Sequence, residues 1–524
     1  MITLKSYLRG EWVEGLSDLA TLVDPATGEP IAHAGTGGLD LVAALELARS
    51  EGGPALRALT FAERGAILKA MSAAIHEARE ELIEASILNA GTTRSDAKFD
   101  VDGASGTLAY YASLGKKLGD ARVLVEEPEQ LTRSTRFFGT HVWVPLSGVA
   151  VHVNAFNFPA WGLAEKAAVA LLAGVPVISK PATATALLTV RMMEKIVASG
   201  ALPRGALQLI VGSTQDLLEH LGPQDALAFT GSGDTGTKLR GLPNVLARST
   251  RVNVEADSLN AAVLAPGADD ETYAMFLRDV SKEMTQKTGQ KCTATRRIFV
   301  PAPMIDRVEE DLIERLKQVR VGHPAHADVT MGPLATAQQR EDFRAGIAKL
   351  EASGARVVFG SAAECEVIGA DASKGFFVGP MLLRADAPRA AHAVHEHEVF
   401  GPAATLMPYE STDDVVELVA RGGGGLVASV YGDDRELLPS LVLGLAPHHG
   451  RVLLGSKKVA DQAIPPGLVL PSCVHGGPGR AGGGEELGGE RGLRFYMQRC
   501  AVQGDRALVD KILGVRSGGE PAAG

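Results

Sequence analysis

The segment from residue 148 to 211 constrains the fold most, because short apolar runs alternate there with helix-length segments. The runs 149–153, 175–179 and 207–211 predict buried strands, and the segments 161–173 and 184–199 predict the helices between them. Buried strands separated by helices of this length form βαβ units, whose strands run parallel. The sequence therefore predicts an α/β fold built on a parallel sheet.

A second α/β region follows Glu255, with a predicted helix over 270–287 and predicted strands over 297–300 and 356–359. The chain has 524 residues, which suggests about three domains at roughly 100–200 residues each. Near the N-terminus, Thr60 and Glu63 form a capping-box pattern. We expect one long helix to begin there and to stop at Gly91.

Composition narrows the possible partners. The 52 basic side chains against 62 acidic ones give a net charge of −10, which argues against nucleic acid. The longest apolar run, 167–178, falls short of the ~20 residues that a membrane-spanning helix needs. The first residues show no charged leader followed by an apolar stretch and a cleavage site. We therefore expect a soluble, cytoplasmic protein without a membrane or nucleic-acid partner.

The four cysteines are far apart and form no CxxC pair, so neither a zinc site nor a disulfide framework is supported, and no metal is expected. Cys292 has the most suggestive neighbours, in Gly289-Gln290-Lys291-Cys292. An ionised thiol is a strong nucleophile, and Lys291 could lower the pKa of Cys292. The alternative is a buried, inert thiol.

The segment 231–236 fits the pattern G-x-G-x-x-G and follows a possible strand that ends at Thr230. In a dinucleotide-binding fold, a carboxylate about 20 residues further on contacts a ribose, and Glu255 lies at that distance. The loop could also bind a pyrophosphate through backbone N–H groups without this arrangement. The pattern alone leaves the role of Glu255 open.

Six motifs occur in the order typical of one family, and on them the chain resembles the aldehyde dehydrogenase superfamily over nearly its whole length. They are Phe156-Asn157-Phe158-Pro159, Lys180-Pro181-Ala182, Phe229-Thr230-Gly231-Ser232, Glu255, Gly289-Gln290-x-Cys292 and Glu398-Val399-Phe400-Gly401-Pro402. The segments 255–260 and 475–489 further resemble the semialdehyde dehydrogenases of the phenylacetyl-CoA and benzoyl-CoA epoxide routes of aromatic degradation.

The phenylacetate proteins usually carry a hydratase domain after the dehydrogenase, for which 524 residues leave no room, so the benzoate branch is favoured. This resemblance implies 3,4-dehydroadipyl-CoA semialdehyde as the substrate. The alternatives are 3-oxo-5,6-dehydrosuberyl-CoA semialdehyde, a CoA-acylating dehydrogenase and a catalytically silent scaffold. Because CoA-acylating relatives generally lack a carboxylate at the position of Glu255, its presence favours hydrolysis.

The resemblance also implies the catalytic roles. Cys292 would attack the aldehyde, and the Asn157 amide with the Cys292 backbone N–H would hold the oxyanion. The dinucleotide pattern assigns Glu255 to a ribose, whereas the resemblance assigns it to catalysis. The preferred role is the general base that activates water for attack on a Cys292 thioester. Glu486 matches a second carboxylate that would relay protons. His475 is interpreted as a structural histidine in preference to a CoA or subunit contact.

For the cofactor, the resemblance implies NADP, with NAD possible. Many NAD-selective relatives have Glu at the position of Thr183, where a carboxylate would repel a 2′-phosphate, whereas Thr183 and Lys180 would bind it. Ser232 would contact the pyrophosphate, Glu398 the nicotinamide ribose and Phe400 the nicotinamide side. The expected cofactor-binding residues are Lys180, Thr183, Gly231, Ser232, Glu398 and Phe400.

The implied fold is the aldehyde dehydrogenase fold, with two parallel-sheet α/β domains and a β-strand oligomerisation extension that makes at least a homodimer. Departures from the family pattern at 256–258 and 479–481 lie near the base and the interface. The expected divisions are a cofactor-binding domain over 1–131 and 148–255, a catalytic domain over 256–475, a bridging segment over 132–147 and 476–505, and a C-terminal tail over 506–524.

Overall fold

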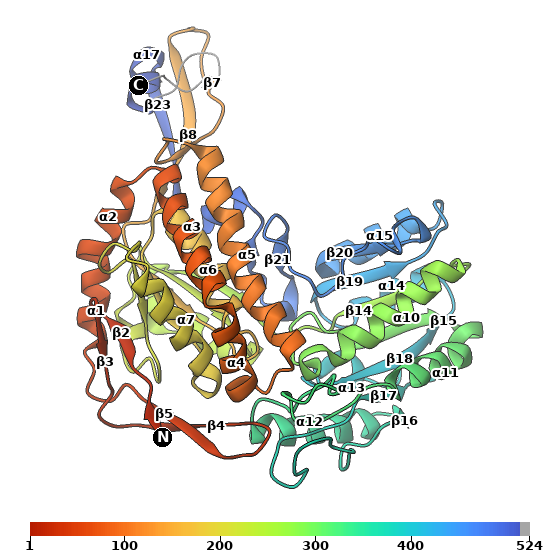
Figure 1. Cartoon of the computed structure of the whole chain (residues 1–524). Coiled ribbons are helices and arrows are strands. Elements are labelled where there is room, and N and C mark those ends of the chain that lie inside the picture. The colour runs from red at the N-terminus through yellow and green to blue at the C-terminus, as the bar shows by residue number, and fades with distance from the viewer. Residues whose placement is uncertain (514–524) are drawn as a thin grey trace.

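The computed structural model describes residues 1–513 and shows two α/β lobes and a projecting β-arm (Figure 1). The first lobe contains a seven-stranded sheet in the order β13-β12-β9-β10-β11-β2-β3, in which only β2 runs antiparallel to its neighbours. These strands are β2 Ser6–Leu8, β3 Glu11–Val13, β9 Ala150–Val153, β10 Val177–Lys180, β11 Leu207–Leu209, β12 Ala226–Thr230 and β13 Arg251–Glu255. The parallel sheet expected over 148–211 is confirmed.

A small sheet of β1 Ile2–Thr3, β5 Pro30–Ala34 and β4 Ala20–Val23 lies at the N-terminus. The helix α6 is buried along its whole length except at Gly162, because its sequence is apolar apart from Glu165 and Lys166, and it forms the centre of this lobe. The helices of the lobe are α1 Leu41–Leu47, α2 Gly53–Ala58, α3 Phe61–Glu77, α4 Arg79–Ala90, α5 Arg94–Leu118, α6 Trp161–Ala173, α7 Ala186–Ala198, α8 Gly233–Arg240 and α9 Pro243–Arg248.

The capping box at Thr60 is present, since its side chain accepts from the Glu63 N–H and the Glu63 carboxylate accepts from the Thr60 N–H at 2.8 Å. The expectation of a single helix from there to Gly91 is wrong, because the helix breaks at Ala78. Both halves pack on α5 and α7, and α3 also packs on α6. The second half does end at Gly91, which is left-handed with φ 65°.

The second lobe contains a seven-stranded sheet in the order β16-β17-β18-β15-β14-β19-β20, in which only β16 runs antiparallel to its neighbour. Its strands are β14 Ala261–Leu264, β15 Arg297–Pro301, β16 Arg356–Phe359, β17 Met381–Arg384, β18 Ala403–Tyr409, β19 Gly425–Tyr431 and β20 His449–Gly455. Its helices are α10 Asp270–Thr285, α11 Ile305–Leu316, α12 Ala337–Ala352, α13 Ala393–Glu396, α14 Thr412–Ala420 and α15 Leu438–Leu445.

The arm is a four-stranded sheet in which β8 Phe137–Pro145 pairs antiparallel with β23 Met497–Asp505 over nine residues. The strands β6 Leu124–Val125 and β7 Glu129–Gln130 also pair with β8, so the arm begins before residue 132. Within the expected tail, 506–513 forms the helix α17 Arg506–Leu513, and the rest of the tail lies outside the described residues.

The hairpin of β21 Val474–Gly476 and β22 Glu485–Leu487 is separate from the arm, although much of it falls in the expected bridging segment 476–505. It contacts α6 and β13 of the first lobe and β19 and β20 of the second. The short helix α16 Glu490–Leu493 then leads into β23. The hairpin thus joins the two lobes beside the ends of their strands.

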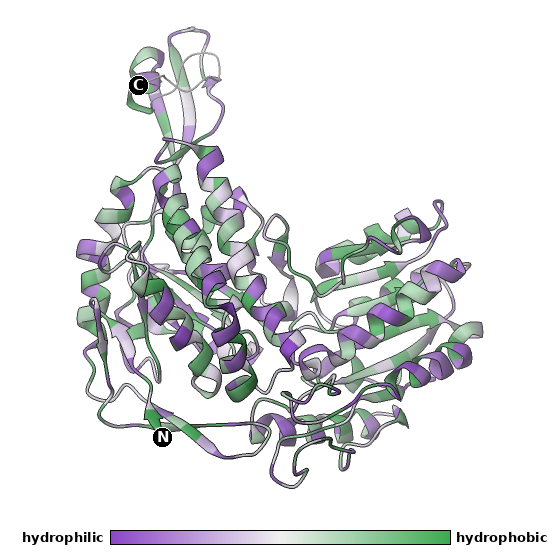
Figure 2. Cartoon of the chain, in the orientation of Figure 1, coloured by the Kyte–Doolittle hydropathy of each residue, from purple (hydrophilic) through white to green (hydrophobic). Residues whose placement is uncertain are grey.

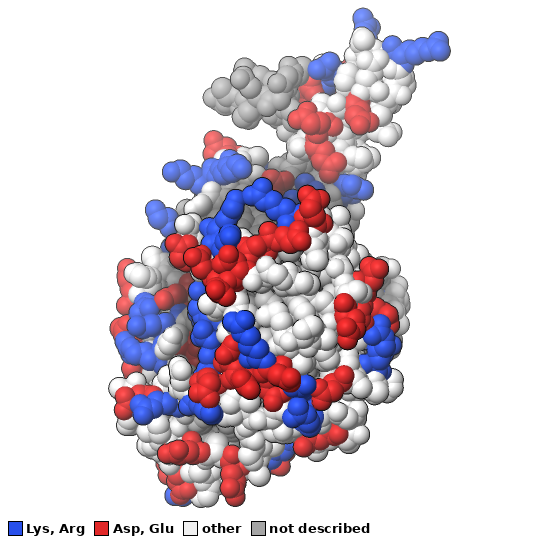
Figure 3. Space-filling model, turned by 90° about the vertical axis from the view of Figure 1, so that its right-hand side faces the viewer, with Lys and Arg blue, Asp and Glu red and all other residues white. Residues whose placement is uncertain are grey.

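Apolar residues concentrate in the two sheets and on the helix faces that cover them, with polar residues outward (Figure 2). On the face that the second lobe turns away from the first, acidic and basic side chains intermingle around an uncharged area (Figure 3). Ion pairs such as Arg384–Asp306 at 2.6 Å contribute to this mixture on the second lobe. Among the described residues, no helix has the length and apolar character needed to cross a membrane.

Candidate active site

Two cavities meet between the lobes, beside the carboxyl ends of β9, β12 and β13. The larger, of about 800 Å³, is lined by Ala182, Gly231, Ser232, Glu398 and Phe400, among others. The smaller, of about 30 Å³, is lined by Phe158, Trp161, Gly467, Val469 and His475, among others. Asn157, Glu255 and Cys292 line both. Crevices at the carboxyl ends of parallel strands are the usual ligand sites of α/β folds.

The loop that carries Cys292 is held in an unusual backbone conformation. It follows the 3₁₀ turn η4 Gln286–Gly289, in which Lys287 and Thr288 are left-handed with φ of 53° and 56°. Non-glycine residues rarely adopt this region, and such strain concentrates at functional sites. The expectation of a helix continuing to 287 therefore fails, because the chain must leave α10 here to bring Cys292 to the cavities.

Asn260 fixes the backbone at Cys292 and just after it. Its side-chain amide donates to the carbonyl oxygens of Cys292 at 2.7 Å and Ala294 at 2.8 Å. Its Oδ1 accepts from the Val427 N–H at 3.0 Å, and Asn260 is only 1% exposed. A buried amide with both ends satisfied holds the nucleophile loop against β14 and β19.

Lys291 does not assist Cys292. Its ammonium group lies 2.6 Å from Glu283 Oε2, also donates to Gln286, and is fully buried. The suggestion that Lys291 lowers the pKa of Cys292 is therefore wrong, because adjacent side chains here point apart. Burial, with the nearby Glu255 carboxylate next in effect, instead raises the pKa of the Cys292 thiol well above its usual value.

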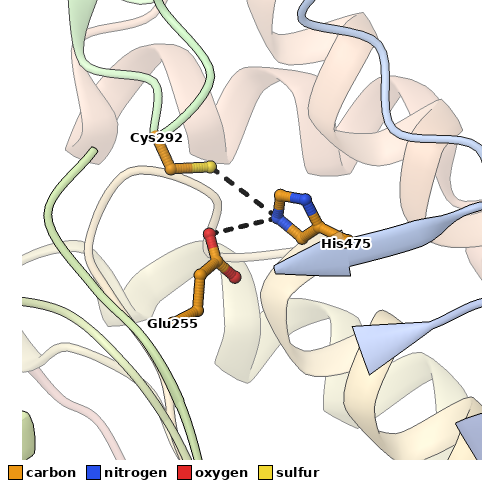
Figure 4. Close-up of side chains that lie close together, drawn as sticks. All are labelled: Glu255, Cys292 and His475. Atoms are coloured by element: carbon orange, nitrogen blue, oxygen red, sulfur yellow. Dashed lines mark hydrogen bonds and ion pairs between the residues drawn. The ribbon is translucent and has the colours of Figure 1, made fainter. Parts of the chain in front are cut away.

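Glu255 ends β13 with its side chain toward the thiol. Its Oε1 lies 3.1 Å from His475 Nε2, and the same nitrogen lies 3.8 Å from Cys292 Sγ (Figure 4). Glu255 and His475 are 2% and 4% exposed. Burial by itself raises the pKa of Glu255, but His475 and Lys166 outweigh it and hold that pKa below its usual value. The carboxylate is therefore ionised beside the thiol.

Glu486 lies in the same buried region, on β22 directly opposite His475 on β21. Its Oε1 accepts from the Asn253 amide at 3.1 Å, and its Oε2 lies 3.1 Å from Lys166 Nζ. Burial raises the pKa of Glu486 to about 7, against the lowering effect of Lys166. A carboxyl group with a pKa near 7 can both release and accept a proton at neutral pH.

The larger cavity gathers four of the six residues expected to bind the cofactor. Gly231 and Ser232 stand at the start of α8, where the Ser232 hydroxyl caps the helix by accepting from the Thr235 N–H at 3.4 Å. Glu398 accepts from the Ser258 N–H at 3.0 Å and from Arg296 Nε at 3.2 Å, and burial raises its pKa. The Phe400 ring lies 5.8 Å from the Phe156 ring, between centroids.

Lys180 and Thr183 are not among the residues that line this cavity. Lys180 ends β10 and Thr183 begins the short helix η2 Thr183–Thr185, on either side of the lining residue Ala182. Burial lowers the pKa of the Lys180 ammonium group. Both residues therefore stand at the edge of the cavity, next to the carboxyl end of the first sheet.

Comparison with known proteins decides the family, because the profile of the aldehyde dehydrogenase family matches residues 12–502. The chain belongs to the aldehyde dehydrogenase family. It is 46% identical over 478 residues to a 3,4-dehydroadipyl-CoA semialdehyde dehydrogenase of Aromatoleum evansii, covering 91% of this chain and 93% of that protein. It is 30% identical over 436 residues to an alpha-ketoglutaric semialdehyde dehydrogenase of Bacillus subtilis (strain 168), covering 82% and 85%.

Among solved structures, a betaine aldehyde dehydrogenase of Staphylococcus aureus in complex with NAD⁺ superposes with a TM-score of 0.83. The two share 23% sequence identity, and the match covers 96% of this chain and 97% of that one. At this identity the match establishes the fold: this is the aldehyde dehydrogenase fold, with α/β lobes. The expected family and fold are confirmed.

Several residues of this aldehyde dehydrogenase site were not predicted from the sequence. The sequence predicts a structural role for His475, but the structure places this residue in the smaller cavity beside Glu255 and Cys292, and its place in the unusual segment 475–489 is the signal for that position. Asn260 closes the other unusual segment, 255–260, and anchors Cys292. Lys166 and Arg296 belong to no sequence motif that indicates the site. Lys166 lies within an otherwise apolar helix, and Arg296 follows a turn.

Replacing Asn260 by Asp tests its anchoring role. A carboxylate cannot donate, so two buried carbonyls lose their partner and the Cys292 loop is released. We expect the free energy of unfolding to fall by about 2 kcal/mol. The first-turnover rate of NAD(P)H formation should fall at least about tenfold. Chemical denaturation and stopped-flow absorbance would measure these two effects.

Asn244→Asp is the matched control. The Asn244 amide also donates to two carbonyl oxygens, those of Leu218 at 2.9 Å and Leu221 at 3.3 Å, but it lines neither cavity. This variant should lose stability and keep the first-turnover rate. Equal loss of rate in both variants would show that Asn260 acts only through global stability.

Proposed function

We propose that this aldehyde dehydrogenase oxidises a CoA-linked semialdehyde, 3,4-dehydroadipyl-CoA semialdehyde, to the carboxylate with NADP in benzoate degradation. The observation that carries the chemistry is that Cys292, Glu255 and Asn157 lie where a large and a small cavity meet. The substrate assignment is supported by the 46% identity to the Aromatoleum evansii enzyme over 91% of the chain. That relative carries this activity in its name.

Cys292 is the proposed nucleophile. Its thiolate attacks the aldehyde carbon, and the oxyanion that forms is held by the Asn157 amide and the Cys292 backbone N–H. One such donor typically contributes roughly 3–4 kcal/mol to transition-state stabilisation. An amide suits this role because it donates without carrying a proton that could be lost. Loss of hydride from the adduct leaves a thioester on Cys292.

Glu255 is the proposed general base for hydrolysis of that thioester. Its carboxylate is ionised and buried, and it lines the smaller cavity together with Cys292. It can therefore accept a proton from water there. The competing ribose role is disfavoured by the 3.1 Å pair with His475, which directs the carboxylate toward Cys292. Glu486, whose pKa is raised to about 7, is the proposed next proton carrier.

The larger cavity fits a dinucleotide in size and in its donor groups. Ser232 and Gly231 at the start of α8 are the proposed pyrophosphate contacts, because the positive end of the helix dipole favours an anion. Glu398 is the proposed partner of the nicotinamide ribose, with Phe400 packed beside the ring. Lys180 and Thr183 are proposed for the 2′-phosphate. The bound nicotinamide supplies the hydride acceptor.

Two alternatives from the same family are kept. Oxidation of 3-oxo-5,6-dehydrosuberyl-CoA semialdehyde would use the same site residues and differ in the acyl chain that enters the smaller cavity. A CoA-acylating enzyme would release the acyl group to CoA, and the ionised Glu255 beside Cys292 disfavours it. The proposed assembly is a homodimer in which the arm of β8 and β23 adds to a neighbouring subunit's sheet.

The substrate assignment predicts the outcome of a panel of free aliphatic aldehydes and CoA-linked semialdehydes, each assayed with NAD and with NADP. We expect the highest kcat/KM for the 3,4-dehydroadipyl-CoA compound, and a carboxylate as the product, identified by mass spectrometry. Equal kcat/KM values for short free aldehydes would remove the CoA assignment and leave aldehyde oxidation standing. A strict requirement for added CoA would favour the acylating alternative.

Glu255→Gln separates the base role from the ribose role. Without a base for water, the thioester should accumulate, so a near-normal burst of NADPH should be followed by steady turnover at least about 100-fold slower. Rapid-mixing absorbance measures both phases. Normal steady turnover with weakened cofactor binding would instead support the ribose role.

Thr183→Glu tests cofactor selection. A carboxylate at this position repels a 2′-phosphate, so kcat/KM for NADP should fall at least about tenfold, or ~1.4 kcal/mol, relative to NAD. Thr183→Ser keeps a hydroxyl donor and is the control that should retain the wild-type ratio. An unchanged ratio in Thr183→Glu would place the 2′-phosphate elsewhere.

A further inference from the structure

The proposed mechanism gives no role to the imidazole of His475, although this side chain lies within the site. Its Nε2 is within reach of both reacting side chains, at 3.1 Å from Glu255 Oε1 and 3.8 Å from Cys292 Sγ (Figure 4). The carboxylate oxygen, the sulfur and the ring nitrogen all lie within 4.8 Å of one another. His475 also lines the smaller cavity with these two residues.

The contact with Glu255 favours a protonated ring nitrogen. An ionised carboxylate only accepts and is negatively charged, so Nε2 at 3.1 Å from it is stabilised when it carries a proton. Burial alone lowers the pKa of His475, but the charge and hydrogen bond of Glu255 outweigh it and raise that pKa. The ring is therefore held as a donor, and as a cation more readily than an ordinary histidine.

Ionisation of the Cys292 thiol requires a donor or a positive charge beside the sulfur. Ionisation of Cys292 places a second negative charge beside Glu255 in a buried site, and both burial and that carboxylate oppose it. Lys291, the adjacent cation in the sequence, is bound to Glu283 and points elsewhere. Within the described part of the chain, His475 is the donor that the structure places against the sulfur.

We propose that His475 is a further catalytic residue whose Nε2–H serves as the counter-charge of the Cys292 thiolate and alternates between that sulfur and Glu255. When the thiol ionises, the S–H bond breaks, its electron pair stays on sulfur and the proton passes to water. Nε2–H then turns from Glu255 Oε1 to Cys292 Sγ. A thiolate beside an imidazolium is far more populated than an isolated one.

The same proton then serves the second half-reaction. Once the sulfur is esterified it carries no charge, so Nε2–H returns to Glu255 and keeps that carboxylate ionised, the form that accepts a proton from water. Expulsion of the sulfur regenerates a thiolate facing the same donor. His475 therefore loses no proton over the cycle, and the two protons released come from the thiol or water and from the acid formed.

Other charged groups near the His475 ring also shift its pKa. Glu165 favours the cationic ring and Arg451 opposes it, while the charge of His475 in turn lowers the pKa of Glu486. The position is built by the backbone, because β21 carries His475 directly opposite Glu486 on β22. The charged groups around the ring are Glu255 on β13, Glu165 and Lys166 on α6, Glu486 on β22, Arg451 on β20 and Cys292 itself.

Alkylation of Cys292 by iodoacetamide across a range of pH, without aldehyde or cofactor, tests this role. Peptide mass spectrometry would follow each thiol separately. In His475→Gln, a side chain remains to donate to Glu255 but none titrates, so the apparent pKa of Cys292 should rise by at least about one unit. Its alkylation at neutral pH should slow at least about tenfold. The exposed thiols Cys473 and Cys500 should react as in the wild type.

Two controls exclude a purely structural effect. His449→Gln replaces another buried histidine, which bonds the Leu445 carbonyl at 3.2 Å, and should leave the alkylation profile of Cys292 unchanged. NADP binding and the thermal midpoint establish that His475→Gln is folded. If that variant is unfolded, His475→Asn with added imidazole serves instead, and imidazole should restore fast alkylation.

A wild-type pH profile for Cys292 in folded His475→Gln, together with a normal NADPH burst, would overturn the proposal. This inference rests on Cys292 as the nucleophile, which Cys292→Ser tests separately through loss of all aldehyde oxidation. Because alkylation needs no substrate, a wrong substrate assignment leaves its outcome unaffected.

Discussion

The site depends on bringing the Cys292 thiol of one lobe against the Glu255 carboxylate of the other. Each group, when ionised, would be stabilised by a positive neighbour, yet here each has the negative charge of the other beside it. Cys292 arrives on a loop of the second lobe and Glu255 on the last strand of the first sheet. Neither lobe alone contains the pair. The geometry therefore depends on the joint between the lobes, where the β21–β22 hairpin contacts both.

Burial of these groups makes their protonation states depend on their neighbours. In a water-poor pocket, charges interact strongly, so each carboxyl group adopts a protonation state set by its neighbours. Glu255 is held ionised by His475 and Lys166, whereas Glu486, a few ångströms away, has a pKa near 7. Two chemically equivalent side chains thus differ in pKa, because His475 and Lys166 outweigh burial at Glu255, whereas the Glu165 and Glu255 carboxylates add to the effect of burial at Glu486.

The cofactor side shows a different principle. Gly231 and Ser232 stand at a helix start, and the Asp257 carboxylate accepts from the Gly233 N–H at 3.1 Å there. Glu398 is fixed by Ser258 and Arg296. These contacts use residues of the segment 256–258, in which the chain departs from the common family pattern. The departure therefore shapes the larger cavity, which Ala256 and Asp257 line.

The sequence by itself determined the α/β class, the parallel strands from 149 onward and the family, because apolar periodicity and ordered motifs are local properties. It did not determine that the helix after Thr60 breaks at Ala78, that Lys291 turns to Glu283, or that His475 meets Cys292. Those outcomes depend on which distant residues compete for each side chain. Residues 183 positions apart come within 3.8 Å only when the lobes and the hairpin pack, so only the tertiary structure could decide them.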